Sequence, residues 1–339
     1  MVKESKSNSN SKSDHSLPPR EGGGWVLLFV LSLFVSCHSS PSLSPEEEAR
    51  RDSAALHVAL MPVQDCLPFY VAQRAGIYDS LGLDLRILTL QAQLDTDTAF
   101  MRGHVEVAYS DFARAIMMQQ DSVSLRAIAA VKGDLYLITD SQHHVRHLGQ
   151  LRERMVAVAR HSITDYWSDR LTDTAKLARA DIFRPQINNV RIRTDMLCNS
   201  TMDAAFLPEP YASEALLRGN IKNFSTECLS PRLVAFIAPE TVLEDSTRNQ
   251  QIRLLFKGYD IAAEQLRNQK QSALLAVLYK ELCLIPDSLI DTLVHSPINM
   301  PPLTSPQQAD ADAALRWLRT RGKVRDEYAA DSIISSFSY

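Results

Sequence analysis

Apolar segments alternate with polar turns along the chain in the order of strand, loop and helix. The first unit begins with the apolar segment 56–61, turns at 62–68, continues as a helical stretch at 69–75 and returns as a strand at 83–90. Gly76 follows the helical stretch, where a glycine commonly ends a helix. Strand, helix and strand in this order make a βαβ unit, for which a right-handed crossover is expected.

The same alternation predicts the elements that follow. Further strands are expected at 105–109, 125–131, 135–139, 155–159, 189–193, 202–206 and 233–238. Helices are expected between them at 96–102, 112–120 and 166–178. From residue 245 onward the pattern is mostly helical, with apolar residues spaced along one helix face. Ser305 and Pro306 open the last long helix, in which Trp317 is expected to pack in the core.

Two stretches of the chain share one pattern. Residues 103–111 and 200–208 each run small residue, spacer, apolar, acid, apolar, alanine and aromatic, followed by a turn and a helix. Such self-similarity suggests two halves built alike. In the second stretch Pro208 and Pro210 bracket Glu209, which predicts a strand, a rigid turn and a helix start. Open α/β sheets bind ligands at the carboxyl ends of their strands, so two α/β lobes should present such loops to a shared cleft.

Composition and charge narrow the class of protein. The chain has 339 residues, enough for two ordinary domains, with 45% apolar and 22% charged residues, as in a globular protein. The net charge is −4 and no basic stripe is visible. Nucleic-acid binding is therefore not expected.

The N-terminus carries the features of an export signal. Basic residues precede the apolar run 25–35, which has the length of a signal-peptide core and is short for a membrane span. Ser36 then stands directly before Cys37, an arrangement that resembles a bacterial lipoprotein cleavage site. We predict a lipoprotein signal peptide at 1–36, lipidation of Cys37 and a flexible tether at 37–54. The alternative is an ordinary cleaved signal followed by an incidental cysteine.

Four cysteines remain after the export signal, and their spacing fits no CxxC metal site. Export permits disulfides, and Cys198 with Cys228 is the pair that we would test first. Buried free thiols remain an equally open alternative for Cys66, Cys198, Cys228 and Cys283.

No catalytic or metal-binding motif is recognisable. His143, His144 and His147 lie in a polar stretch, where a solvated surface run is favoured over a metal site. The sequence has no G-x-S-x-G, P-loop or dinucleotide fingerprint. We therefore expect no metal, no cofactor and no enzyme.

An ordered series of motifs resembles one protein family. Leu67–Tyr78 reads LPFYVAQRAGIY, Gly82–Leu88 reads GLDLRIL, and Glu209–Ala212 reads EPYA. Residues 148–158 resemble the segment with which the chain of one protein family enters its second lobe. Together these motifs resemble the periplasmic substrate-binding proteins of ABC importers, in the branch that includes sulfonate, nitrate and thiamine-pyrimidine binders. The resemblance covers residues 56–335.

The resemblance implies an α/β, two-lobe periplasmic binding protein fold of type II. Each lobe is expected to be a mostly parallel sheet flanked by helices, with a hinge between them. The first lobe is predicted to comprise 55–133 with 238–339, and the second 134–237. Two chain crossings, near 131–139 and 226–238, form the expected hinge.

The resemblance also implies which loops contact the ligand. The candidate ligand-binding residues are Gln64, Asp65, Cys66, Tyr109, Ser110, Asp111, His161, Ser162, Thr164, Glu209 and Tyr211. For Ser162, Thr164 and Asp111 the alternative is plain helix capping, and for Glu209 a solvated rim position. Three carboxylates stand on these loops and Arg160 lies only at one margin, so a neutral or amine-bearing small molecule is favoured over a doubly charged anion.

The function that the resemblance implies is solute capture for import. The protein is then a monomeric lipoprotein of the cell envelope, facing the periplasm, that closes around a small organic solute and delivers it to an ABC permease and its ATPase. The enzyme alternative is a fold relative in thiamine-pyrimidine synthesis, but the dense cysteine cluster of that family is missing here. A solute-sensing lipoprotein is the third alternative.

Overall fold

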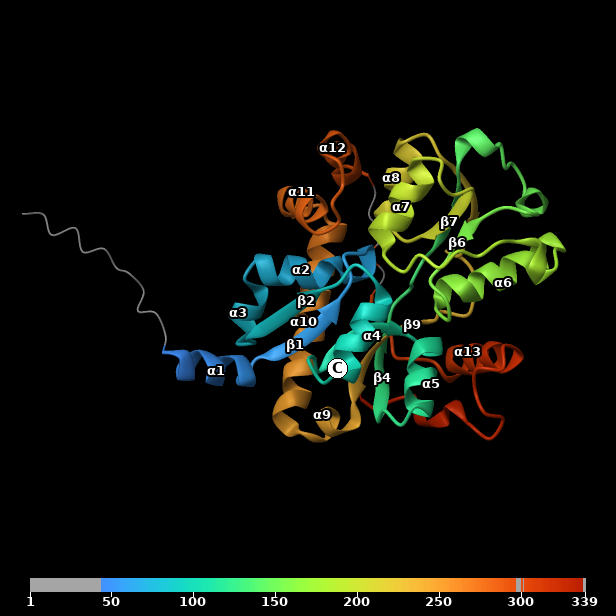
Figure 1. Ribbon diagram of the computed structural model, residues 1–339. Coiled ribbons are helices and arrows are strands. Elements are labelled where there is room, and N and C mark those ends of the chain that lie inside the picture. The colour runs from blue at the N-terminus through green and yellow to red at the C-terminus, as the bar shows by residue number, and fades with distance from the viewer. Residues whose placement is uncertain (1–43, 297–299, 301, 338–339) are drawn as a thin grey trace, which may run out of the picture.

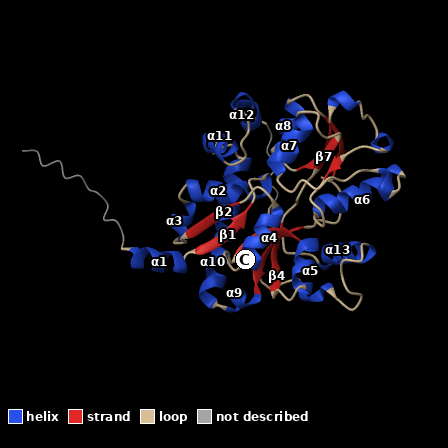
Figure 2. Cartoon of the chain, in the orientation of Figure 1, coloured by secondary structure: helices blue, strands red, loops and turns tan. Residues whose placement is uncertain are grey.

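The computed structural model describes residues 44–296, 300 and 302–337, and shows two sheets, each flanked by helices (Figures 1 and 2). The larger sheet has five strands in the order β2-β1-β3-β9-β4. Its strands are β1 Leu56–Leu60, β2 Leu85–Thr89, β3 Val107–Asp111, β4 Leu125–Ala130 and β9 Val234–Pro239. The smaller sheet has four strands in the order β6-β7-β5-β8. Its strands are β5 Tyr136–Thr139, β6 Val156–Ala157, β7 Ala204–Leu207 and β8 Ile221–Ser225.

Both sheets are mixed but mostly parallel, as the sequence predicted, because in each of them all strands except one run in the same direction. β1 is parallel to β2 and β3, and β6 is parallel to β7. Every antiparallel pair involves β9 or β5, each of which is antiparallel to both of its neighbours. These are the two strands that the chain forms directly after crossing from one sheet to the other. The α/β class is confirmed, and the crossings explain why the parallel pattern is interrupted.

The two crossings lie side by side. The chain leaves the larger sheet between β4 and β5 and returns between β8 and β9. The Leu135 amide donates to the Thr226 hydroxyl at 2.9 Å, and the Thr226 amide donates to the Leu135 carbonyl at 3.0 Å. The predicted lobe boundary between 237 and 238 falls inside β9, which belongs wholly to the larger sheet.

Most helices surround the larger sheet, either on it or on the helices that cover it. They are α2 Leu67–Arg74, α3 Ile77–Leu81, α4 Gln93–Met101, α5 Phe112–Gln120, α9 Glu240–Glu244, α10 Ser246–Arg267, α11 Ser272–Glu281, α12 Asp287–Val294 and α13 Gln308–Thr320. The smaller sheet carries α6 Ile163–Ala175, α7 Val190–Cys198 and α8 Tyr211–Leu217, and α12 also packs against α8. Aromatic rings join α2, α10 and β9, since the Phe69 ring lies 4.7 Å from Tyr259 and 5.2 Å from Phe236. The predicted apolar face of α10 is buried as expected.

One predicted strand is a helix. Residues 189–193 begin α7, in which Asn189 accepts a hydrogen bond from the Ile192 amide and so caps the first turn. The stretch alternates over a few residues, which suggested a strand. Val190, Thr194 and Leu197 are buried, and their spacing of four and three residues is that of a helix face. The strand prediction was therefore wrong because the window was too short to separate the two periods.

The segment expected as part of a flexible tether is helical where the structure describes it. α1, Pro45–Ala54, starts with a capping box between Ser44 and Glu47 and has three acidic residues in its first turn. It buries no residue. The predicted signal peptide and Cys37 lie outside the described residues. Within residues 44–296, 300 and 302–337, no helix is long and apolar enough to cross a membrane.

The four described cysteines are free thiols. Cys66 and Cys283 are buried, Cys198 is half-buried and Cys228 is exposed. Of the two alternatives for these residues, the structure shows unpaired thiols rather than a bond between Cys198 and Cys228.

Candidate functional site

Loops that follow strand ends meet where the two lobes face each other. The loop after β1 contains a 3-10 turn, Gln64–Cys66, and the Gln64 amide donates to the carbonyl of Glu209, after β7 in the other lobe, at 2.8 Å. β3 ends at Asp111, whose carboxylate accepts from the Ile163 amide of α6 at 3.0 Å. The structure thus brings together the strand-end loops on which the sequence placed the ligand contacts.

Asp65 and Tyr109 form one side of this junction. The Tyr109 hydroxyl donates to Asp65 Oδ2 at 3.1 Å, and its ring packs edge-on against Phe236. Burial raises the pKa of Asp65 to about 6, opposed by the Tyr109 hydrogen bond and reinforced by the nearby Asp134 carboxylate. A positively charged partner would therefore stabilise the ionised form of Asp65.

The Asp111 carboxylate caps two helices, one from each lobe. Its Oδ1 accepts from the Arg114 amide at 2.9 Å, which is the N-cap bond of α5. Its Oδ2 accepts from the Ile163 amide at the start of α6 and from Gln93 Nε2 at 2.8 Å. The side chain is fully buried, and burial raises its pKa while these hydrogen bonds oppose the shift. The capping alternative is thus present at Asp111, and it extends across the lobe interface.

The side chains of Ser110 and Cys66 are buried within the first lobe. The Ser110 hydroxyl donates to Asp97 Oδ1 at 2.8 Å, and Arg114 Nε donates to Asp97 Oδ2 at 2.6 Å. The Cys66 thiol is fully buried, and burial raises its pKa well above the ordinary value. The two hydrogen bonds to Asp97 hold the corner between β3 and α5, whereas Cys66 lies in the turn after β1.

The loop after β6 is folded around the start of α6. Ser162 is the N-cap, and its hydroxyl accepts from the Thr164 amide at 3.2 Å and donates to the Ala159 carbonyl at 2.8 Å. The Thr164 hydroxyl accepts from the Ala159 amide at 2.8 Å. His161 has a φ of +60°, and burial lowers its pKa. The capping alternative for Ser162 is therefore also present.

Glu209 and Tyr211 lie on the corner between β7 and α8. Glu209 Oε2 accepts from the Ser213 amide at 3.0 Å, and burial raises the pKa of this carboxyl. Tyr211 is fully buried, with its hydroxyl 3.5 Å from Gln91 Oε1 and its ring 5.6 Å from the Arg191 guanidinium carbon. Glu209 is half-buried rather than a freely solvated rim residue.

Sequence reasoning missed residues that take part in this junction. Gln91 and Gln93 follow β2, and the strand-end rule applied to the other strands would have found them. Tyr136 begins β5 directly after the first crossing, and because it is not at the carboxyl end of a strand, the strand-end rule would not have found it. Burial, followed by the Glu209 carboxylate, raises the pKa of its hydroxyl.

Of the three histidines in the predicted stretch, His143 lies beside acidic side chains. His143 Nδ1 lies 2.9 Å from Asp140 Oδ2 and 3.3 Å from Asp203 Oδ1. In the part of the chain that the structure describes, no three His, Cys, Asp or Glu residues are grouped so that they could hold a metal ion.

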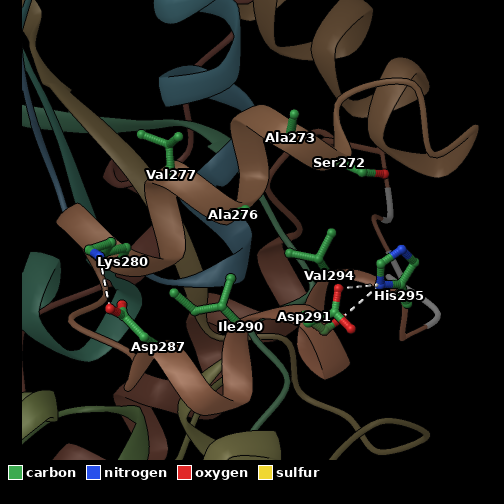
Figure 3. A pocket seen from close by; sticks show the side chains of 10 residues that line it. All are labelled: Ser272, Ala273, Ala276, Val277, Lys280, Asp287, Ile290, Asp291, Val294 and His295. Carbon is green, nitrogen blue, oxygen red and sulfur yellow. Dashed lines mark hydrogen bonds and ion pairs between the residues drawn. The ribbon is translucent and has the colours of Figure 1, made fainter.

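The structure has concave surfaces at the loop after β6 and between α11 and α12. A cavity of about 670 Å³ includes His161 and extends between α6 and the residues after α13. A groove of about 490 Å³ lies between α11 and α12, where Val277, Ile290 and Val294 line the walls and Lys280 pairs with Asp287 at 2.9 Å (Figure 3). The groove contains none of the predicted ligand-binding residues.

Comparison with known proteins identifies the fold. The model of the NMT1/THI5 like family matches residues 64–208. The periplasmic aliphatic sulphonate binding protein SsuA of Escherichia coli is 14% identical, with a TM-score of 0.67 over 83% of this chain and 97% of that chain. The alkanesulfonate-binding protein SsuA of Xanthomonas axonopodis pv. citri, bound to MOPS, is 13% identical, with a TM-score of 0.69 over 83% and 98%.

The nitrate-binding protein NrtA of Synechocystis PCC 6803 is 11% identical, with a TM-score of 0.66 over 82% of this chain and 84% of that chain. No curated protein sequence matches the chain. At such identities the likeness to solved structures establishes the fold. Residues 64–208 are thus an NMT1/THI5-like segment, in a chain that has the type II periplasmic binding protein fold.

Proposed function

We propose that this protein is the solute-binding component of an ABC-type importer and captures a small organic solute between its two lobes. The observation that carries the proposal is the convergence of strand-end loops from both lobes at Gln64–Glu209 and Asp111–Ile163. A solute held there would contact both lobes at once and so favour the closed arrangement. The solved structures that share the fold are named as binding proteins, which supports a non-catalytic role.

The solute would be held by the predicted ligand-binding residues. Asp65, Asp111 and Glu209 are three carboxyls whose pKa values burial raises. An amine-bearing solute would supply the missing positive charge, and the buried hydroxyls of Tyr109 and Tyr136 border the same carboxyls. We therefore keep the preference for a neutral or amine-bearing solute over an anionic one at this junction.

Thermal unfolding in the presence of candidate solutes tests this function. A solute at a hundred times its dissociation constant stabilises the folded state by about 2.7 kcal/mol, which raises the melting temperature measurably. Glu209→Gln should weaken the effect of the same solute, while Glu264→Gln on the exposed side of α10 should not. Stabilisation by sulfonates or nitrate alone would refute the charge preference, and indifference to every amine, neutral nutrient and anion would refute solute capture.

We further propose that Cys37 carries the lipid anchor and that the closed form docks on a membrane permease with its ATPase. One buried methylene contributes about 0.8 kcal/mol, so several acyl chains hold a protein stably on a membrane. Cys37→Ala should move the protein from the membrane fraction to the soluble fraction, whereas Cys228→Ala, at an exposed thiol, should leave it in place. Unchanged fractionation of Cys37→Ala would exclude the anchor.

A further inference from the structure

Arginines from both lobes gather around two carboxylates on α6. Asp165 and Asp169 stand one turn apart, and Arg179 contacts both, with Nη2 3.3 Å from Asp165 Oδ1 and Nε 3.0 Å from Asp169 Oδ1. Arg321, which follows α13 in the other lobe, lies 2.5 Å from Asp169 Oδ2 and 3.6 Å from Asp165 Oδ2. The carboxylates therefore fix two guanidinium groups from opposite lobes beside one another.

More positive charge surrounds the adjoining cavity than these carboxylates neutralise. The cavity of about 670 Å³ is also lined by Arg160, Arg184 and Lys323. Arg160 and Lys323 are exposed, and neither side chain pairs with a carboxylate among residues 44–296, 300 and 302–337. Arg184 is 7% exposed and donates from Nε to the Ser168 hydroxyl at 2.6 Å. Among the described residues, five cationic side chains thus line the cavity, whereas Asp165 is the one carboxylate in its lining.

The excess of positive charge at the cavity also affects the pKa values of His161 and Arg184. His161 Nδ1 is buried without a hydrogen-bond partner, although Asp165 Oδ2 lies 4.0 Å away. Burial lowers the pKa of His161, and Lys323 and Arg321 lower it further. Burial likewise lowers the pKa of Arg184, with Arg179 adding to the shift. Cations crowded in this way are stabilised by an anion that lies among them.

We propose that this cavity is a binding site for a small, multiply charged oxyanion, such as a phosphate-bearing molecule. Guanidinium groups bind phosphate oxygens through paired N–H donors, and those of Arg179 and Arg321 are already oriented by ion pairs. The cavity shares the loop of His161 with the junction but contains none of its carboxylates Asp65, Asp111 and Glu209, and it favours an anion where the junction favours a cation.

Because residues from both lobes line the site, a bound anion would change the equilibrium between the open and closed arrangements of the lobes. Arg160, Arg179 and Arg184 belong to the lobe of the smaller sheet, whereas Arg321 and Lys323 follow α13, which lies next to α6 at the interface (Figure 1). An anion among them has its full set of contacts only when the lobes are closed. Anion binding therefore favours closure and strengthens solute binding at the junction by the same factor in both directions.

Calorimetric titration with inorganic pyrophosphate tests the site. The wild-type protein should bind pyrophosphate saturably in excess of a sodium chloride control of equal ionic strength. Arg160→Ala combined with Lys323→Ala should weaken binding by about tenfold or more, since it removes two unpaired cations. Arg170→Ala combined with Lys270→Ala removes the same charge from exposed positions outside this cavity and should preserve the affinity.

The result that overturns the site is equal weakening in both double variants, which would show a general charge effect, or no saturable binding in the wild type. Glu209→Gln should leave pyrophosphate affinity unchanged, so failure of solute capture and failure of this site are distinguished. Small-angle scattering checks the coupling, because pyrophosphate should shift the wild-type protein toward the compact form. Pyrophosphate binding without such a shift would contradict the inference that a bound anion favours lobe closure.

Discussion

The Asp111 carboxylate links helices of the two lobes through hydrogen bonds. Its two oxygens accept from the Arg114 amide of α5, from the Ile163 amide of α6 and from Gln93. A negative charge at a helix N-terminus is favoured by the free amides and the helix dipole. Here one charge serves two helix termini in different lobes, inside a fully buried environment.

Removing this carboxylate should therefore cost more than removing an ordinary cap. Asp111→Ala leaves buried amides without an acceptor, and we expect a loss of roughly 3 kcal/mol in the free energy of unfolding. Asp111→Asn keeps one acceptor oxygen and should cost less. Asp245→Ala is the matched control, because Asp245 caps α10 at the surface through the Arg248 amide, and its loss should cost about 1 kcal/mol. Denaturant titration of the three variants gives these values, and equal costs at Asp111 and Asp245 would contradict the shared cap.

The pKa of Asp65 predicts how stability depends on pH. Its value of about 6 in the folded protein lies above the ordinary 3.8, so the folded state holds the proton more tightly than the unfolded state. The resulting stabilisation is complete below about pH 4 and is lost as the pH rises through 6. Relative to Asp65→Asn, the wild type should lose roughly 2 kcal/mol between pH 4 and 7, less than the full shift implies because the side chain is partly exposed.

Denaturant titrations at several pH values measure this difference. Asp95→Asn, an exposed change on α4, serves as the control and should follow the wild type at every pH. Parallel curves for the wild type and Asp65→Asn would show that Asp65 titrates normally.

The contacts of the candidate site residues were predictable where a local rule applies. Asp111 and Ser162 follow strands and precede helices, and the sequence indicated both a capping and a ligand role for them. The bond from Ile163 to Asp111 was not predictable, because it joins segments 52 residues apart through lobe packing. The gathering of Arg179 and Arg321 was missed for the same reason, since no single loop contains both.

At the scale of elements, the strand and helix order was largely readable, and the failures have physical causes. Residues 189–193 alternate like a strand but form the first turn of α7, since their burial continues at helical spacing. α1 forms from its own cap and composition in a segment read as a tether. β5 and β9 run against their neighbours because they follow crossings between sheets, which a hydrophobic pattern does not encode.

The first crossing depends on a glycine. Gly133 has a φ of +64°, and a Cβ there would stand 2.9 Å from Val234 Cβ in β9. Gly133→Ala should therefore lower the free energy of unfolding by roughly 2–4 kcal/mol, from both the backbone conformation and the collision. Gly103→Ala is the control, because φ is +69° but nothing lies within 4 Å, and its cost should be about 1–2 kcal/mol. Equal melting temperatures for the two variants would contradict a close approach at the crossing.

At the scale of the molecule, contacts outside the loop junction also join the lobes. Trp317 Nε1 donates to Asp169 Oδ2 at 2.9 Å, and the Trp317 ring lies edge-on to Tyr166 with centroids 5.6 Å apart. The sequence assigned Trp317 to the core, and it is buried, but part of its contact surface belongs to the opposite lobe. Whether two lobes touch through such a residue cannot be read from helical periodicity.

Trp317→Phe should open the molecule without unfolding it. The phenylalanine keeps much of the ring contact but loses the hydrogen bond, worth about 1 kcal/mol, so the ratio of open to closed molecules should rise about fivefold. Small-angle scattering of the solute-free protein should then show a larger radius of gyration. Trp167→Phe, on a ring that packs against Phe224 within one lobe, should not change it. An unchanged radius in Trp317→Phe would show that this contact does not hold the lobes together.

The position of β9 has a consequence for how the chain is made. β9 lies between β3 and β4, yet more than a hundred residues, including the whole smaller sheet, are synthesised between β4 and β9. Until residue 234 emerges, β4 has no strand to pair with in its sheet. The larger lobe therefore stays incomplete during most of translation. A chain of this design that is exported would stay unfolded enough to pass through a membrane channel until its last third is made.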